Sequence, residues 1–215
     1  MRTSRLARVP QLRRASAALL LVLAAVVLGA PSAVADAGES IPSYQARVDV
    51  RSDGSIHVRE TIRYTFGAGE RHGIYRDLRT QFTYDPTGAG TDQVRVYPVE
   101  DVTVSSPDAP ADVEVTDQGS ITHIQIGSPD QTVSGTKTYV LDYTVRGAFN
   151  RITTESTDDG GTTVPPHDEL YWNITGDEWT VPIESAAVTV NASAAPIAVQ
   201  CYRGVRGSTD TCAAS

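Results

Sequence analysis

Apolar and polar side chains alternate with a period of two along much of this chain, and this pattern predicts β-strands. The clearest case is residues 56–66, where the even-numbered side chains are mostly apolar and the odd-numbered ones polar. A half-buried strand requires this alternation because successive side chains point to opposite faces of a sheet. Residues 138–145 alternate in the same way. Asp53-Gly54 is a turn signal that predicts a hairpin between residues 44–50 and 56–66.

Weaker patterns predict the remaining strands. These are expected at residues 94–104, 111–116, 121–126, 170–175 and 183–190. Turn residues fall between them, and no segment after residue 35 shows a convincing helical period over twelve residues. Short strands without alternating helices predict an all-β fold, an antiparallel β-sandwich. The Cys–Trp–Cys arrangement of an immunoglobulin domain is absent from the sequence.

Residues 1–35 are typical of a signal peptide. Five arginines precede an apolar run of 16 residues, Ala15 to Ala30, and Ala33-Val34-Ala35 supplies the small residues of a cleavage site before Asp36. The alternative is an uncleaved anchor helix, but a membrane span needs about 20 apolar residues, so cleavage is favoured. We therefore expect an exported, extracytoplasmic protein.

The charge of the mature chain argues against nucleic-acid partners. All 26 acidic residues follow residue 35, whereas 5 of the 18 basic residues precede it, which leaves 13 basic against 26 acidic residues and a net charge of −13. Such a surface repels phosphate backbones and anionic lipid head groups. Solubility is a sufficient explanation of this charge.

Cys201 and Cys212 are the only cysteines. In an exported chain an even count favours a disulfide, which would stabilise a loop of about a dozen residues by roughly 3 kcal/mol. Two free thiols or two metal ligands are the alternatives. No histidine or further cysteine lies nearby in the sequence to complete a metal site, so the disulfide is favoured.

Three segments carry a family resemblance. They are Asp-Gly-Ser-Ile-His-Val-Arg-Glu (53–60), Arg-His-Gly-Ile-Tyr-Arg-Asp-Leu (71–78) and Leu-Tyr-Trp-Asn-Ile-Thr-Gly-Asp-Glu-Trp (170–179). They resemble the extracytoplasmic domain of a bacterial family of predicted membrane proteins, domain-of-unknown-function family 2207, over roughly residues 41–212. The resemblance implies a leader, a β domain and then transmembrane helices, so we expect attachment to the membrane through a segment missing from this chain. It implies no reaction.

These observations predict three parts. Residues 1–35 are the signal peptide, residues 36–200 the extracytoplasmic β-sandwich domain, and residues 201–215 a disulfide-closed loop at a truncated C-terminal end.

Glu60 breaks the alternation because it lies on the apolar face of residues 56–66. An unpaired carboxylate there would cost several kcal/mol, so it requires a partner, a proton or a bulge that turns it outward. Arg71 and Arg76 flank the turn expected at Gly73 and are the natural partners, Arg76 first. The three residues form either a structural ion pair, which we favour, or a recessed site for an anionic ligand.

The aromatic cluster near residue 175 offers a second candidate site. Trp172 shares its face with Leu170 and Ile174 and is expected in the core. Tyr171 would point outward and Trp179 follows a turn, so these two rings are candidates for a carbohydrate-binding surface.

Catalytic and metal-binding patterns are absent from the sequence. The four histidines are scattered, and adjacent acids (158–159, 168–169 and 177–178) lack calcium-loop spacing and are expected in solvated loops. We expect no enzymatic activity, no cofactor and no bound metal. The favoured hypothesis is a non-enzymatic interaction or sensory domain of a membrane protein, with an envelope protein or glycan as partner. The alternative is a cell-envelope glycan-binding or hydrolase domain, which would need two carboxylates in a cleft beside an exposed tryptophan.

Overall fold

The computed structural model describes residues 38–85, 90, 93–153, 156–157, 161 and 163–213. They lie in one compact unit, Val34–Ser215. The predicted signal peptide lies outside the described residues. Every regular element among the described residues is a strand, so the all-β prediction is confirmed.

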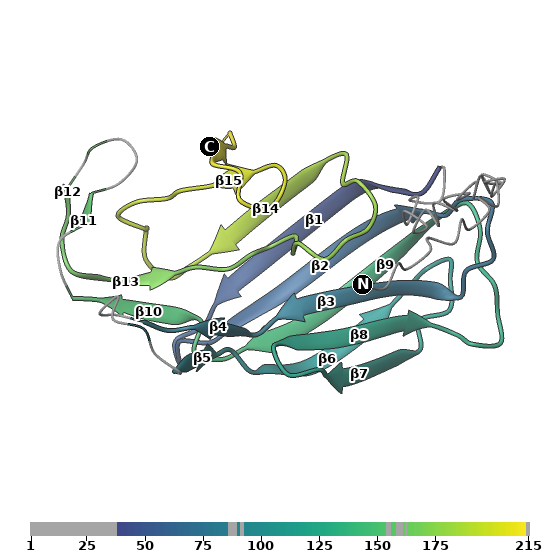
Figure 1. Cartoon of the computed structure of the whole chain (residues 1–215), viewed down its shortest axis with the longest axis horizontal. Coiled ribbons are helices and arrows are strands. Elements are labelled where there is room, and N and C mark those ends of the chain that lie inside the picture. Colours follow the sequence, from purple (N-terminus) through teal and green to yellow (C-terminus); the bar gives the residue numbers. More distant parts are fainter. Residues whose placement is uncertain are drawn as a thin grey trace, which may run out of the picture. The chain divides into compact units, whose positions relative to one another are not determined.

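One layer is a five-stranded sheet with the order β14-β1-β2-β9-β6 (Figure 1). Its strands are β1 (Ser40–Val50), β2 (Ile56–Thr65), β6 (Val99–Ser105), β9 (Thr136–Val145) and β14 (Ala186–Asn191). The predicted hairpin joins β1 to β2, and the turn at Gly54 has a φ of +79°, which favours glycine. The pairing of β1 with β14 is parallel, unlike the antiparallel arrangement expected throughout. The chain enters β14 beside the start of β1, where Tyr44 N donates to Ser185 O.

The second layer contains a three-stranded antiparallel sheet with the order β3-β8-β7. Its strands are β3 (Gly73–Arg79), β7 (Val113–Asp117) and β8 (Ile121–Gly127). Four further two-stranded pairs complete the described elements. They are β4 (Gln81–Thr83) with β5 (Val94–Val96), β10 (Phe149–Ile152) with β13 (His167–Leu170), β11 (Ser156–Thr157) with β12 (Thr163–Val164), and β15 (Tyr202–Arg203) with β16 (Asp210–Thr211).

The core lies between the two layers and follows the predicted alternation. The inward side chains of β2 and β9 are buried, as are Ile74 and Leu78 of β3 and Ile124 and Ile126 of β8. Outward side chains of β2 and β9 are mostly polar. The sandwich is therefore held by the burial of one apolar face from each sheet.

Two strand predictions and one turn prediction are wrong in detail. Residues 94–104 form two strands, because Pro98 has no N–H to donate to a continuous ladder. Residues 171–175 form no strand. They begin an irregular segment that continues to residue 185 and packs Trp172, Ile174 and Trp179 against the core. The expected turn at Gly73 is the start of β3.

Candidate functional site

Glu60 and Arg76 form a buried ion pair between the two sheets. Glu60 lies at the middle of β2 with no exposed surface, and Arg76 lies at the middle of β3 with 1% of its surface exposed. Arg76 Nε donates to Glu60 Oε2 and Arg76 Nη2 donates to Glu60 Oε1, both at 2.9 Å. Each sheet thus points one charged side chain from the middle of a strand at the other sheet. Of the two arginines considered as partners, Arg76 is the one that contacts Glu60.

The remaining polar atoms of this pair are also bonded. Tyr143 OH donates to Glu60 Oε1 at 2.7 Å. Arg76 Nη1 donates to Asp77 O at 2.9 Å, and Nη2 donates to Ile174 O at 3.0 Å. Tyr44 OH also donates to Ile174 O, at 3.2 Å. Such bonds offset the desolvation of the two charges, which would otherwise exceed their attraction.

Arg76 and the two tyrosines hold fixed protonation states at neutral pH. Burial raises the pKa of Tyr143 well above its ordinary value, and the Glu60 carboxylate raises it further. Burial raises the pKa of Tyr44 in the same way. Burial alone would lower the pKa of Arg76, but the carboxylate of Glu60 outweighs it and the pKa is raised. Arg76 therefore stays charged and both phenols stay neutral donors.

The irregular segment wraps around the guanidinium of Arg76. Gly176 has a φ of +75°, and a Cβ on it would lie 2.3 Å from Arg76 Nη1, so only glycine fits here. Trp179 Nε1 donates to Thr175 O at 2.8 Å. Arg76 Cζ lies 5.9 Å from the ring centres of both Tyr44 and Trp179. The second and third sequence segments, almost 100 residues apart, therefore build one cluster around Arg76.

The two rings of the predicted aromatic surface lie in different surroundings. Tyr171 is 62% exposed, but Trp179 is partly buried, with its ring edge-on to Tyr44 at 6.4 Å. Trp179 follows the turn at Gly176 and packs its ring against the core. Trp172 is partly buried and packs edge-on to Tyr97 at 6.2 Å, close to its expected core position.

Arg71 contacts another carboxylate. Its Nε donates to Glu39 Oε1 at 3.0 Å, and Tyr64 OH donates to Glu39 Oε2 at 2.9 Å. Burial, and then the bond to Glu39, raise the pKa of Tyr64. Arg71 was expected to pair with Glu60 only if Arg76 did not; Arg76 holds that place and Arg71 pairs with Glu39. Glu39 directly precedes β1, and no pattern in the sequence signals its role.

A cleft of about 320 Å³ lies beside this cluster. Residues 73–77 of β3 line one wall, and Glu178, Trp179 and Thr180 line the other. Tyr75 stands at the cleft with 58% of its surface exposed and stacks on His123, with ring centres 5.1 Å apart. His123 Nδ1 lies 2.5 Å from Asp77 Oδ1. Sequence reasoning missed Tyr75 and His123, which the register of β3 against β8 brings together.

The charged groups at the cleft are paired with one another. Glu178 pairs with Arg79, Asp77 with His123, and Glu39 with Arg71. A second hollow of about 340 Å³ continues along the start of β3, lined by residues 70–75 and 125–127.

One edge of β3 faces this cleft. Among the described strands only β8 pairs with β3. Thr80 N donates to Ser120 O. Bonded positions alternate in an antiparallel ladder, so the backbone groups of Arg76 point to β8 and those of Tyr75 and Asp77 point away from it. The bond from Arg76 Nη1 to Asp77 O agrees with this assignment. The backbone N–H and C=O of Tyr75 therefore face the cleft.

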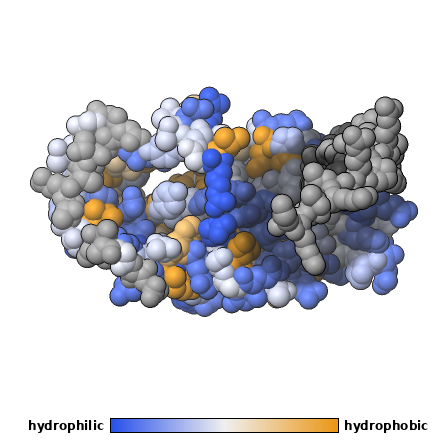
Figure 2. Space-filling view, viewed as in Figure 1, coloured by the Kyte–Doolittle hydropathy of each residue, from blue (hydrophilic) through white to orange (hydrophobic). Residues whose placement is uncertain are grey.

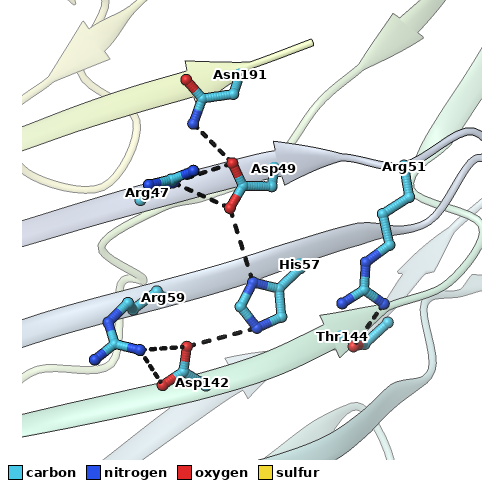
Figure 3. A network of polar contacts seen from close by, with 8 residues as sticks. All are labelled: Arg47, Asp49, Arg51, His57, Arg59, Asp142, Thr144 and Asn191. Atoms are coloured by element: carbon cyan, nitrogen blue, oxygen red, sulfur yellow. Dashed lines mark hydrogen bonds and ion pairs between the residues drawn. The ribbon is translucent and has the colours of Figure 1, made fainter. Parts of the chain in front are cut away.

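The outer face of the five-stranded sheet is different in character. Figure 3 shows His57 between two carboxylates, with Nδ1 4.0 Å from Asp49 Oδ2 and Nε2 3.5 Å from Asp142 Oδ1. Arg59 pairs with Asp142 at 3.0 Å. A hydrogen bond from Asn191 lowers the pKa of Asp49. Partly exposed ion pairs of this kind contribute little to stability, and we interpret this face as an ordinary solvated surface.

Metal-binding groups are not found in the described part of the chain. No three His, Cys, Asp or Glu side chains there are arranged to hold a metal ion. The acidic pair 168–169 lies on β13, and the pair 177–178 contacts Arg206 and Arg79. The pair 158–159 lies outside the described residues.

The predicted disulfide between Cys201 and Cys212 is present, with a Cα–Cα distance of 5.4 Å. It closes the hairpin of β15 and β16, and Cys212 N also donates to Cys201 O at 3.0 Å.

No helix among the residues that the structure describes has the length and hydropathy of a membrane span.

Comparison with protein families shows to which family the chain belongs. Residues 40–211 match the family described as predicted membrane protein (DUF2207), N-terminal domain, and the chain belongs to this family. The resemblance seen in the sequence is thereby confirmed. No curated protein matches the chain.

Solved structures show only distant likeness. The yeast leukotriene A4 hydrolase matches with a TM-score of 0.40 and 12% identity, over 81% of this chain and 26% of the hydrolase. The M1 zinc metallopeptidase of Deinococcus radiodurans matches with a TM-score of 0.30 and 13% identity, over 50% of this chain and 20% of the peptidase. This chain therefore spans about a quarter or less of these enzymes.

Proposed function

We propose that this N-terminal domain of a membrane protein is a non-enzymatic, extracytoplasmic interaction domain that binds an extended polypeptide segment along the free edge of β3. The observation that carries the proposal is the cleft whose wall is five consecutive residues of an edge strand, 73–77. An exposed strand edge offers backbone donors and acceptors to an added strand, and flanking hollows accept its side chains.

The chemistry of the cleft supports recognition of a polypeptide. Each described carboxylate at the cleft has a cationic or imidazole neighbour, so an added strand would not meet an isolated charge. The exposed ring of Tyr75 supplies apolar contact area beside its own backbone groups. The buried Glu60–Arg76 pair is too deep to meet a ligand and holds the two walls in place instead. This arrangement supports the proposal of a binding domain.

The test uses a photo-crosslinking amino acid at Thr180, an exposed residue on the opposite wall, in cells that export the protein. Tyr75→Pro removes the backbone N–H that faces the cleft and leaves the ladder to β8 intact. Tyr75→Ala removes only the ring and is the matched control. We expect a discrete polypeptide adduct that persists in Tyr75→Ala at reduced yield and is lost in Tyr75→Pro.

Three results would contradict the proposal. An adduct of equal yield in Tyr75→Pro would show that the edge of β3 does not bind the partner. An adduct that glycan-degrading enzymes remove would support the glycan-binding alternative. Absence of any adduct in all three proteins would leave the cleft without the proposed occupant. Thermal unfolding of each variant establishes that the comparison is made between folded proteins.

A further inference from the structure

The hairpin closed by Cys201 and Cys212 presents apolar side chains to solvent. Val205 is 84% exposed, the highest value among the large apolar residues that the structure describes. Ile197 and Val199 just before the hairpin are also about two-thirds exposed, at 68% and 66%. Isolated exposed apolar residues are ordinary, but three within nine residues of chain form a concentrated feature.

The hairpin holds Val205 in a defined position. The disulfide joins its two ends, β15 pairs with β16, and Ser208 N donates to Val205 O at 2.9 Å. Arg206 Nε lies 3.1 Å from Asp177 Oδ2, which ties the hairpin to the segment that wraps around Arg76. Because these contacts hold the turn in place, Val205 cannot move to bury its side chain within the domain. Its exposure is therefore a property of the fold.

Charge sets this region apart from the rest of the chain. Of the 26 acidic residues, 25 lie at or before Glu184, and Asp210 is the only one in residues 185–215. The same stretch holds Arg203 and Arg206. A chain whose mature part carries −13 thus ends its domain in a stretch with more basic than acidic residues. Figure 2 shows separate orange, hydrophobic patches on a largely hydrophilic face.

We propose that this apolar hairpin contacts the surface of a phospholipid bilayer. Val205, Ile197 and Val199 would enter the boundary between head groups and acyl chains, while Tyr202, which is 44% exposed, lies at head-group level. Arg203, which is exposed, keeps its charge at the lipid phosphates, with its stem along the apolar surface. The acidic remainder of the domain is repelled by the same phosphates and so faces away. The family match ends at residue 211, beside this hairpin, in a family of predicted membrane proteins.

The proposal is tested by vesicle flotation of the exported, oxidised chain. The probes are vesicles of phosphatidylcholine alone and of phosphatidylcholine with phosphatidylglycerol. Binding through three aliphatic side chains is weak, so the decisive variant is one that strengthens it, Val205→Trp. We expect Val205→Trp to raise the vesicle-bound fraction several-fold and Val205→Asp to lower it to background. Val94 of β5 is 55% exposed and far from the hairpin in sequence, and Val94→Trp and Val94→Asp are the matched controls.

Each other outcome overturns the proposal. Equal gains for Val205→Trp and Val94→Trp would mean that any exposed tryptophan binds lipid. No gain for Val205→Trp on either vesicle would exclude the bilayer as occupant. A concentration-dependent dimer that Val205→Asp dissociates would assign the hairpin to a second copy of the chain. Tyr75→Pro, which tests the cleft, should leave vesicle binding unchanged, so the two proposals fail separately.

Discussion

Removing one partner of the Glu60–Arg76 pair should destabilise the domain far more than removing both. Arg76→Met deletes four hydrogen bonds and leaves the Glu60 carboxylate, with no exposed surface, holding only the hydroxyl of Tyr143. Breaking a buried pair in this way costs about 3–5 kcal/mol. Glu60→Leu should cost a similar amount because it leaves the guanidinium buried and unpaired. Either loss is a large part of the roughly 5–15 kcal/mol by which a domain is stable.

The double variant Glu60→Leu/Arg76→Met removes both charges together. What remains is the Tyr143 hydroxyl without its acceptor, an unsatisfied group that costs about 1–3 kcal/mol. Ile174 O still accepts from Tyr44. The single losses sum to about 6–10 kcal/mol on these estimates, so the double variant should be more stable than the sum by at least about 3 kcal/mol. Adding Tyr143→Phe removes the orphaned hydroxyl and should recover most of the remaining loss.

Urea unfolding of the oxidised protein, followed by tryptophan fluorescence, measures these free energies. A protecting osmolyte in all samples keeps a marginal single variant folded, so that each corner of the cycle has a value. The surface pair Arg59–Asp142 is the control and should show a coupling below about 1 kcal/mol. Losses at Glu60 and Arg76 that add within about 0.5 kcal/mol would refute the reasoning.

Three further predictions concern the surroundings of the pair. Gly176→Ala should lower the free energy of unfolding in urea by at least about 1 kcal/mol more than Gly119→Ala. Both glycines have a similar positive φ, but only at Gly176 would a Cβ meet the guanidinium of Arg76. Equal losses in the two variants would contradict this contact. Trp179→Ala should cost about 3–5 kcal/mol as a packed ring, whereas Tyr171→Ala should stay within about 0.5 kcal/mol; a small loss at Trp179 would restore it as a surface residue. Because burial raises the pKa of Tyr143 in the folded state, its contribution to stability is complete below pH about 10 and falls by about 1.4 kcal/mol per unit above it. Part of the tyrosinate absorbance should therefore appear only together with the loss of circular dichroism, and completion of the whole rise while the protein is still folded would contradict this.

Periodicity alone was enough to predict β2 and its register. Glu60 was expected on the buried face because the neighbouring even-numbered residues are apolar, and it lies there. Periodicity failed for β3, because an arginine occupies the central core position between Ile74 and Leu78 and makes an amphipathic strand read as a polar turn. Glu60 stands out because the rest of its strand alternates clearly. Arg76 instead interrupts the apolar face of a shorter strand, so the alternation of β3 is hard to recognise.

The rest of the candidate site depends on contacts that no local pattern carries. Residues 171–174 alternate as a strand would, yet they belong to an irregular segment. The path of this segment is set by the bond from Arg76 to Ile174 O and by the ring of Trp179 against Arg76. The cleft needs β3 at the edge of its sheet and its register against β8, which brings Tyr75 to His123. Edge position and register are properties of the whole topology, so the sequence could indicate the pair but not the cleft.

The buried pair has a role that an apolar pair could not fill, because it selects one alignment of β3. Ile74, Arg76 and Leu78 share one face, so a slip of two residues would keep the same kind of surface inward. That slip would place an aliphatic side chain opposite Glu60 and leave its carboxylate buried without a partner, at a cost of several kcal/mol. The same guanidinium binds Ile174 O and so fixes the other wall of the cleft. We therefore expect the triple variant Glu60→Leu/Arg76→Met/Tyr143→Phe to regain stability but to hold β3 in more than one alignment. The amide proton of Tyr75 should then be found in more than one environment. A single sharp amide signal for Tyr75 in that variant would show that apolar packing suffices to position the strand.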